Sequence, residues 1–251
     1  MSTDLVTLAV DCGGTRLKAA VLDGSGTMVS ERVRMRTPYP LSPNRFVTEV
    51  VALTAGLHSF DRITLGMPGM IRHGRVLATP HYPTKRGPFT RTDPELVASW
   101  TDFDAAAALE AAFDRPTLVF NDAEVHGFGV IEGSGLEMVV TLGTGLGSAA
   151  FDAGRLAPHI EWSHHPFRKG QTYDRQLGDR ARRKIGPKAW NRRVLDAVET
   201  LRPVIRFDRL YVGGGNAKHV KLNLGDDVTL VAGDAGLTGG ARAWDLGQEK
   251  Q

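Results

Sequence analysis

The 251-residue sequence has a single cysteine, Cys12, and no apolar run near the roughly 18 residues that suggest a membrane-spanning helix. One cysteine excludes an internal disulfide and a zinc site built from several cysteines. The N-terminus lacks the charged, apolar and small-residue succession of a secretory signal. These absences favour a reducing compartment, and we expect a cytoplasmic location. Cys12 itself stands at the end of an apolar stretch, where a small core side chain is expected rather than a nucleophile.

The chain also has little net charge, only +3, but its charges are distributed unevenly. A basic segment, residues 168–193, is opposed only by Asp174 and Asp179. Its cationic members are Arg168, Lys169, Arg175, Arg180, Arg182, Arg183, Lys184, Lys188, Arg192 and Arg193. Such a field attracts a polyanion, although a solvated helix face would show the same pattern. Nucleic acid is not the expected partner, because the segment lacks a known binding module and the aromatic residues of a stacking platform.

What the chain does have is two loops rich in glycine and threonine, each following an apolar run. The first covers Asp11 to Thr15 and the second covers Leu142 to Ser148. Glycine has no Cβ, so such turns let backbone N–H groups approach an anion closely. The two loops together predict that a phosphate chain is held from two sides, as in phosphoryl transfer. Tight turns alone would also explain the glycines, and the assignment depends on the pairing of the loops.

The expected secondary structure repeats one theme in each half of the chain. Strands are predicted over residues 5–10, 17–22, 28–34, 62–67, 117–120, 138–142, 149–151, 209–212 and 228–231. Helices are predicted over residues 44–59, 104–113, 190–201 and 236–244, with a loop over 79–94. This repetition predicts a duplicated α/β fold of two lobes, residues 1–116 and 117–251, with a cleft between them.

Five motifs follow one another in an order that resembles the ROK family, the group of repressors, open reading frames and sugar kinases. They are Asp11-Cys12-Gly13-Gly14-Thr15 with Lys18, Gly66-Met67-Pro68-Gly69, Asn121-Asp122-Ala123, Leu142 to Ser148, and Gly213-Gly214-Gly215. The resemblance implies an actin-like and hexokinase-like (ribonuclease H-like) two-lobed fold with a central cleft. Within the family, the stretch from Tyr173 to Val194, an arginine-rich run that is followed by Lys188 to Val194, resembles the polyphosphate glucokinases.

The resemblance also implies a role for each matching residue. Asp122 would be the catalytic base that takes the proton of the sugar 6-hydroxyl, and Asn121 would hold a neighbouring hydroxyl. An Asn-Asp helix cap is the competing interpretation of this pair. Asp11 would orient Mg²⁺ through water, because magnesium keeps most of its waters. The remaining assignments are sugar contacts by Gly69, Glu161 and His164, donor phosphate contacts by Asp11, Gly13, Gly14, Thr15, Lys18, Gly143, Thr144 and Gly145, nucleotide contacts by Gly213, Gly214 and Gly215, and a polyphosphate track at Arg182 and Arg183.

Three stretches depart from the family pattern. His159 and the pair Trp162-Ser163 replace an asparagine and a leucine-glycine pair around Glu161 and His164. His81 replaces an asparagine that contacts sugar, and residues 233–236 replace an asparagine-rich version. The changes around Glu161 bear on which hexose is preferred more than on kinase activity. At His81, either the histidine substitutes for the asparagine or the sugar contact is absent. The change at residues 233–236 bears on the end of the fold and on the nucleotide pocket. The histidines at 159, 164 and 165 beside Glu161 also admit a metal site, although their spacing fits no zinc motif.

We therefore expect a kinase that phosphorylates glucose or a related hexose, using Mg²⁺ with polyphosphate, ATP or both. The alternative is a catalytically weak sugar sensor of the same fold. Family regulators carry an N-terminal DNA-binding domain, whereas the first strand is expected here by about Leu5, which argues against direct binding of DNA. The resemblance further implies a homodimer.

Overall fold

The computed structural model describes residues 5–231 and 235–246, which belong to two compact units. The first unit comprises residues 1–129 together with 236–251, and the second comprises 130–235. This division differs from the predicted boundary near Pro116. The physical reason is that the strand beginning at Thr117 pairs with a strand of the first unit, so that Asp122 belongs to the first unit as well.

The first unit is built on a mixed five-stranded sheet. Its strands are β1 (Thr7–Cys12), β2 (Arg16–Leu22), β3 (Val33–Arg36), β4 (Arg62–Met67) and β8 (Thr117–Asn121), in the order β3-β2-β1-β4-β8. A smaller sheet contains β5 (Met70–Arg72), β6 (Arg75–Ala78) and β7 (Phe103–Asp104). The helices are α1 (Pro43–Thr54), α2 (Pro94–Trp100), α3 (Ala105–Phe113), α4 (Asp122–Phe128) and α8 (Ala235–Leu246).

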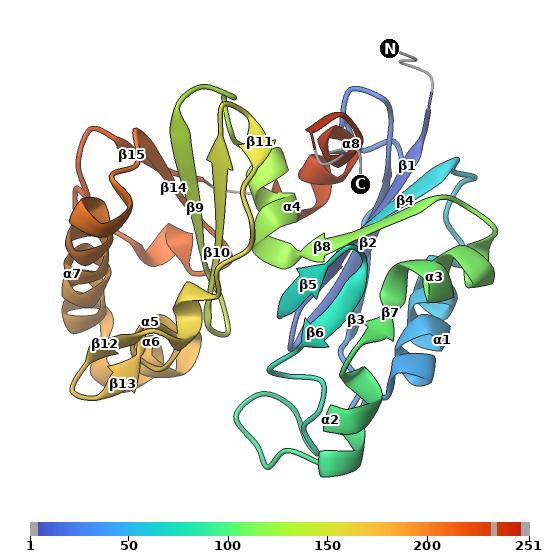
Figure 1. Cartoon of the computed structure of the whole chain (residues 1–251), viewed down its shortest axis with the longest axis horizontal. Coiled ribbons are helices and arrows are strands. Elements are labelled where there is room, and N and C mark those ends of the chain that lie inside the picture. The colour runs from blue at the N-terminus through green and yellow to red at the C-terminus, as the bar shows by residue number, and fades with distance from the viewer. Residues whose placement is uncertain (1–4, 232–234, 247–251) are drawn as a thin grey trace. The chain divides into compact units, whose positions relative to one another are not determined.

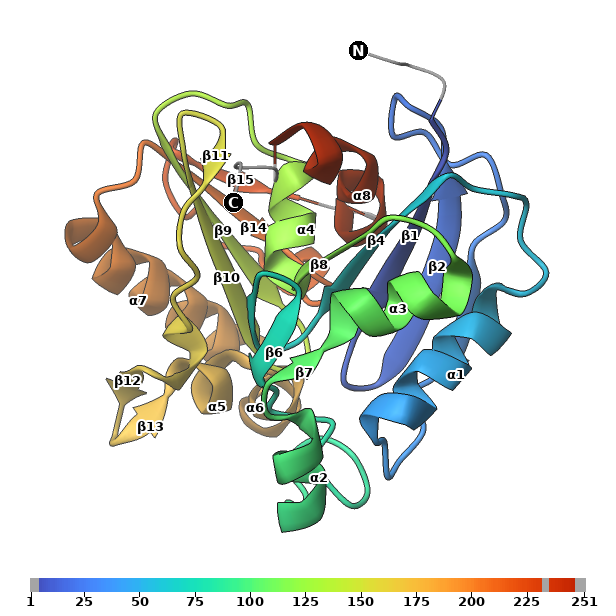
Figure 2. The same cartoon turned by 45° about the vertical axis from the view of Figure 1, so that its right-hand side comes forward.

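Alternation along β1 gives the first sheet two apolar faces. Leu8 and Val10 point to the face where α1 and α3 lie side by side, and Phe46 of α1 and Leu109 of α3 are fully buried there (Figures 1 and 2). Ala9 points to the opposite face. Because side chains alternate across a strand, one apolar run of β1 contributes to both layers.

Helix α8 covers that opposite face. A Cβ at Gly240 would come within 2.9 Å of the Ala9 Cβ, so the helix backbone lies almost on the strand. Thr64 of β4 fixes the helix with its hydroxyl, which donates to the Gly240 carbonyl at 2.7 Å and accepts the Trp244 indole N–H at 2.9 Å. The last helix therefore completes the layer structure of the first unit.

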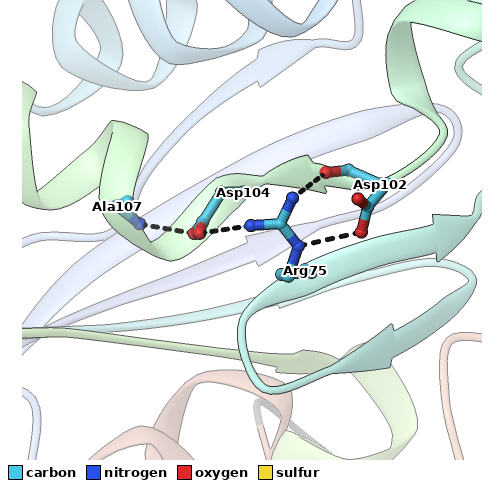
Figure 3. A network of polar contacts seen from close by, with 4 residues as sticks. All are labelled: Arg75, Asp102, Asp104 and Ala107. Atoms are coloured by element: carbon cyan, nitrogen blue, oxygen red, sulfur yellow. Dashed lines mark hydrogen bonds and ion pairs between the residues drawn. The ribbon is translucent and has the colours of Figure 1, made fainter.

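A polar network joins the smaller sheet to α3. The Arg75 guanidinium donates to the Asp102 carboxylate and the Asp104 carboxylate, both at 2.8 Å, and to the Asp102 carbonyl at 2.7 Å (Figure 3). Asp104 also caps α3 by accepting the Ala107 N–H at 2.9 Å. These hydrogen bonds lower the pKa of Asp102, chiefly through its side-chain bond to Arg75. Arg75 thus holds β6, β7 and the start of α3 together.

The second unit repeats the sheet of the first. Its strands are β9 (Leu136–Leu142), β10 (Leu146–Asp152), β11 (Arg155–Leu156), β14 (Arg209–Gly213) and β15 (Val228–Leu230), in the order β11-β10-β9-β14-β15. In both sheets three antiparallel strands are followed by two parallel ones. This shared topology confirms the predicted duplication and the α/β class.

Smaller elements and one long helix complete the second unit. They are a hairpin of β12 (Pro166–Arg168) and β13 (Gln171–Thr172), the helices α5 (Tyr173–Leu177), α6 (Asp179–Ile185) and α7 (Pro187–Ile205), and the 3₁₀ turns η1 (Trp162–His164) and η2 (Ala217–His219). Helix α7 lies beside the sheet of the second unit (Figure 1). Its Trp190, Val194 and Leu201 are buried in one apolar cluster with Val140 of β9 and Val212 of β14. Among the described residues, no helix has the length and apolar character required to cross a membrane.

Candidate active site

The pair Asn121-Asp122 lies where β8 ends and α4 begins. Asn121 is the N-cap: its side-chain oxygen accepts the Ala123 N–H at 2.8 Å, and Glu124 reaches back to accept the Asn121 N–H at 2.9 Å. The helix-cap interpretation therefore holds for Asn121. Asp122, the predicted catalytic base, is not the capping residue. It is the first residue of the helix, and its side chain is half-buried.

The Pro68-Gly69 turn lies beside this pair. The amide of Asn121 donates to the Gly69 carbonyl at 2.7 Å. Gly69 has φ +119°, and a Cβ there would overlap the Ala78 carbonyl, so both conformation and space require glycine. A Cβ at Gly66 would lie 3.2 Å from the Cα of Asp122, which places α4 directly on β4. Gly69, Asn121 and Asp122 are thus brought together within the first unit.

The first glycine loop is the turn between β1 and β2. Asp11 and Lys18 face each other across this hairpin, and the Lys18 ammonium lies 2.6 Å from the Asp11 carboxylate. The Gly13 N–H donates to the Arg16 carbonyl at 2.8 Å, so this amide is already used inside the turn. Cys12 is fully buried, and burial raises the pKa of its thiol. The negative charges of Asp11 and Asp122 raise it further. A buried, protonated thiol agrees with the predicted packing role.

Asp11 offers one carboxylate to a cation. Its side chain is only partly exposed, and a Cβ at Gly236, near the start of α8, would lie 3.5 Å from the carboxylate. No cluster of three or more histidine, cysteine or acidic side chains suited to a metal occurs within residues 5–231 and 235–246. A single carboxylate fits Mg²⁺, which takes one or two protein carboxylates and fills its other positions with water and phosphate oxygens.

The second glycine loop is the turn between β9 and β10. The Gly143 N–H donates to the Gly145 carbonyl at 2.9 Å, so this amide also serves its own turn. The Gly143 carbonyl accepts the Asp179 N–H at 3.0 Å and the Asn216 amide at 2.9 Å. Within the second unit, the loop is therefore tied to the start of α6 and to the segment that follows Gly213-Gly214-Gly215.

The third glycine turn, Gly213 to Gly215, packs against the start of the second glycine loop. Gly214 has φ +82°, and a Cβ there would come within 2.6 Å of the Leu142 carbonyl. The Asn216 N–H donates to that same carbonyl at 2.8 Å. The two predicted binding turns of the second unit thus form a single packed assembly.

Asp174, which no sequence motif singled out as a site residue, lies against this loop. Its carboxylate accepts the Leu146 N–H at 3.1 Å, and a Cβ at Gly145 would overlap it. Burial raises the pKa of Asp174, and the neighbouring Glu161 adds to the rise, while the Leu146 hydrogen bond and His164 oppose it. A carboxylate beside a predicted anion-binding loop could have been found only by knowing that α5 packs there.

The altered sugar motif forms the turn η1. Burial opposes ionisation of Glu161, but the polar side chains of the neighbouring His159 and Ser163 outweigh it and lower the pKa of this carboxyl. The His159 Nε2 lies 3.6 Å from the Glu161 carboxylate. His159 and Ser163, two of the residues that depart from the family pattern, thus both hold Glu161 in its acceptor form.

The basic segment runs from the end of β12 through α5 and α6 to the start of α7. Arg182 and Arg183 both contact the Asp179 carboxylate, with N–O distances of 2.7 Å. Arg183 remains largely exposed. The pKa of His219 is lowered by desolvation, and the charges of Arg182, Lys218 and Lys221 lower it further. Lys218 and Lys221 were not singled out from the sequence, because they lie outside the arginine-rich run.

The predicted residues thus fall into two groups. The first unit holds Asp11, Gly13, Gly14, Thr15, Lys18, Gly69, Asn121 and Asp122, and the second holds Gly143, Thr144, Gly145, Glu161, His164, Arg182, Arg183, Gly213, Gly214 and Gly215. Each unit has a glycine loop at the end of its first strand, and the first unit has a carboxylate at a strand end. These features define the two-lobed, hexokinase-like class of α/β proteins.

The chain belongs to the ROK family, whose model matches residues 7–158. It is 24% identical over 217 residues to a polyphosphate glucokinase of Mycobacterium tuberculosis, a match that covers 82% of this chain and 76% of that protein. The crystal structure of an inorganic polyphosphate/ATP-glucomannokinase from Arthrobacter sp. strain KM superposes with a TM-score of 0.80 at 25% identity, covering 97% of this chain and 99% of that one. A ROK family glucokinase from Streptomyces griseus, solved with glucose and AMPPNP, shares the fold at 18% identity, with a TM-score of 0.74 and coverage of 95% and 98%.

Proposed function

We propose that this protein is a sugar kinase that transfers a phosphoryl group from polyphosphate, ATP or both to the 6-hydroxyl of glucose or a related hexose. The observation that carries the proposal is Asp122, a half-buried carboxylate at the end of β8, next to the Asn121–Gly69 hydrogen bond. Family membership and the names of the relatives support it.

Asp122 would act as the general base. As the 6-oxygen forms its bond to the terminal phosphorus, the O–H proton passes to the Asp122 carboxylate, and the bond from phosphorus to the bridging donor oxygen breaks with its electron pair. By family resemblance we assign the contacts with sugar hydroxyls to Asn121, Gly69, Glu161 and His164. Glu161 is suited to this role because its low pKa keeps it an acceptor.

The donor would be held by the two glycine loops. Since the Gly13 and Gly143 amides serve their own turns, we assign the donor contacts chiefly to Gly14, Thr15, Thr144 and Gly145, with Lys18 adding a charge. Mg²⁺ at Asp11 would neutralise the charge of the donor phosphates. For ATP, the turn Gly213 to Gly215 would lie beside the nucleoside.

Polyphosphate is the donor favoured by the basic segment. The cations of α6, among them the largely exposed Arg183, would bind a chain of phosphates that is longer than a nucleotide can supply. The names of the glucokinase from Mycobacterium tuberculosis and the glucomannokinase from Arthrobacter agree with this donor. A homodimer and a cytoplasmic location stay predictions, to be checked by light scattering and by fractionation of the source cells.

The test is formation of hexose 6-phosphate from glucose or mannose with Mg²⁺, using ATP and polyphosphate in parallel, for the wild type and for Asp122→Asn. Loss of the base should lower kcat by about 100- to 10,000-fold while the sugar still binds. Asp114→Asn, at an exposed aspartate that follows α3, is the matched control. If the wild type binds sugar but makes no product with either donor, the second candidate, a sugar sensor without transfer, replaces the kinase.

A further inference from the structure

Residues 37–39 donate hydrogen bonds to carbonyl oxygens of the first glycine loop. The Thr37 hydroxyl donates to the Gly13 carbonyl and the Tyr39 hydroxyl donates to the Gly14 carbonyl, each at 2.7 Å. The Thr37 N–H donates to the Thr15 carbonyl at 3.2 Å. Three consecutive carbonyls of the loop therefore accept hydrogen bonds from a segment that follows β3.

A second segment, which contains His81 and Tyr82, contacts the loop and donates a hydrogen bond to the Cys12 carbonyl. The fully buried Tyr82 donates its hydroxyl to the Cys12 carbonyl at 3.2 Å. Its neighbour His81 packs its ring on the loop, because a Cβ at Gly14 would come within 2.7 Å of the ring carbon Cδ2. Together the two segments donate a hydrogen bond to each of the four carbonyls of residues 12–15.

The orientation of these carbonyls decides what the loop can bind. A carbonyl oxygen carries partial negative charge, whereas an N–H group attracts an anion, so one peptide flip would turn an attractive loop into a repulsive one. Donors that hold each carbonyl from outside make such a flip costly. Tyr39 is suited to this task, because burial raises the pKa of its phenol and keeps the hydroxyl a donor.

We infer that Thr37, Tyr39 and Tyr82 are positioning residues that fix the first glycine loop with its N–H groups toward the phosphates of the donor. The inference rests on the proposed function and adds the residues that preorganise the loop. A role in core packing alone would depend on the aromatic rings and the threonine methyl group. The positioning role depends on the hydroxyl oxygens, and the two can therefore be separated.

The experiment removes single hydroxyl groups and leaves the rest of each side chain. In Tyr39→Phe and Thr37→Val, donor KM and the Kd for inorganic tripolyphosphate, measured by calorimetry, should rise about 3- to 10-fold, the loss expected for one hydrogen bond. The KM for the sugar should stay within a factor of two of the wild-type value. Combining both changes should weaken tripolyphosphate binding further.

Tyr211→Phe is the matched control, since that hydroxyl donates to Glu137 at 2.8 Å in the second unit. It should lower thermal stability without changing the Kd for tripolyphosphate. Unchanged tripolyphosphate binding in Tyr39→Phe and Thr37→Val would overturn the positioning role, as would an equal rise in the KM of sugar and donor. If the wild type binds tripolyphosphate but transfers no phosphoryl group, the proposed function fails, and the binding data still decide whether the hydroxyls orient the loop.

Discussion

The Asn121 amide and the Gly69 carbonyl are joined by a 2.7 Å hydrogen bond that links the end of β8 to the turn after β4. The same asparagine caps α4 with its oxygen. One side chain therefore sets the start of the helix that carries Asp122 and the position of the neighbouring turn.

Replacing Asn121 with serine should separate these two tasks. Serine still caps the helix, but it cannot donate to Gly69, so the KM for the sugar should rise while the donor KM stays unchanged. The lost hydrogen bond should cost about 1 kcal/mol of unfolding free energy, measured by urea denaturation. Asn44→Ser, at an exposed position in α1, is the control and should change neither quantity. An unchanged sugar KM in Asn121→Ser would show that the Gly69 turn does not need this bond to bind sugar.

Asp174→Asn should stabilise the protein at neutral and alkaline pH. Because burial raises the pKa of Asp174 in the folded state, its ionisation costs stability as the pH rises through that pKa. Asparagine keeps an oxygen for the Leu146 N–H and carries no charge. Thermal unfolding should thus show a higher midpoint for the variant at pH 8, and the difference should shrink as the pH falls toward 4. A lower midpoint at pH 8 would mean that the charge itself is needed for the fold.

His126 should make the protein sensitive to mild acid. Its Nε2 is buried and, within the described part of the chain, has no hydrogen-bond partner, and burial lowers its pKa from 6.5 to about 4. The folded state therefore resists protonation, and stability should be lost as the pH falls from about 6.5 toward 4. The loss from this group is on the order of 2–3 kcal/mol. Denaturant titrations at pH 7 and pH 4.5 should show a smaller decrease for His126→Gln than for the wild type. The exposed His58→Gln should behave like the wild type, and an equal decrease in all three would exclude His126 as the cause.

Replacing Arg182 and Arg183 with glutamate should raise the KM for polyphosphate more than the KM for ATP. A long anion would lose two charged contacts at the protein surface, and each is expected to change KM by about 2- to 5-fold. Because ions screen exposed charges, the difference should narrow with added salt. Arg34→Glu with Arg36→Glu, at exposed positions of β3, provides the same change in net charge outside the basic segment. Equal losses with both donors would place the polyphosphate track elsewhere.

Thr64→Val should destabilise the first unit. Valine has a similar shape, but it leaves the Gly240 carbonyl and the Trp244 indole N–H without the hydroxyl that joins them. Unsatisfied buried groups cost about 1–3 kcal/mol each, so the unfolding free energy should fall by roughly that amount. Thr48→Val, whose hydroxyl is bonded on the surface of α1, is the control. A decrease no larger than that of the control would mean that apolar packing alone holds α8.

The glycine loops and the central strands could be predicted because each has a local signal. The strand predicted over residues 62–67 has these bounds in the structure, and α1 begins at Pro43, one residue before its predicted start. Helix α1 ends at Thr54, earlier than the predicted residue 59, and β3 begins at Val33, later than the predicted residue 28. Gly56 explains the first difference, because glycine is a poor helix former.

Other features have no local signal. Helix α4 is too short for apolar periodicity to reveal, and it depends on the capping of Asn121 and on packing against β4. Tyr39 and Asp174 reach the glycine loops from segments distant in the sequence, so that only the fold identifies them. Residues 233–236, where the sequence departs from the family pattern, lie partly outside the described residues. The structure describes only Ala235 and Gly236 of that stretch.

The return of α8 to the first unit has a consequence for synthesis on the ribosome. The second unit is one continuous segment, residues 130–235, and can close its sheet as soon as that segment has emerged. The first unit must wait, because α8, which packs on β1 at Ala9, is made after the whole second unit. The half that carries Asp122 is therefore begun first and finished last, and until then its nascent chain exposes an apolar surface that a chaperone would recognise.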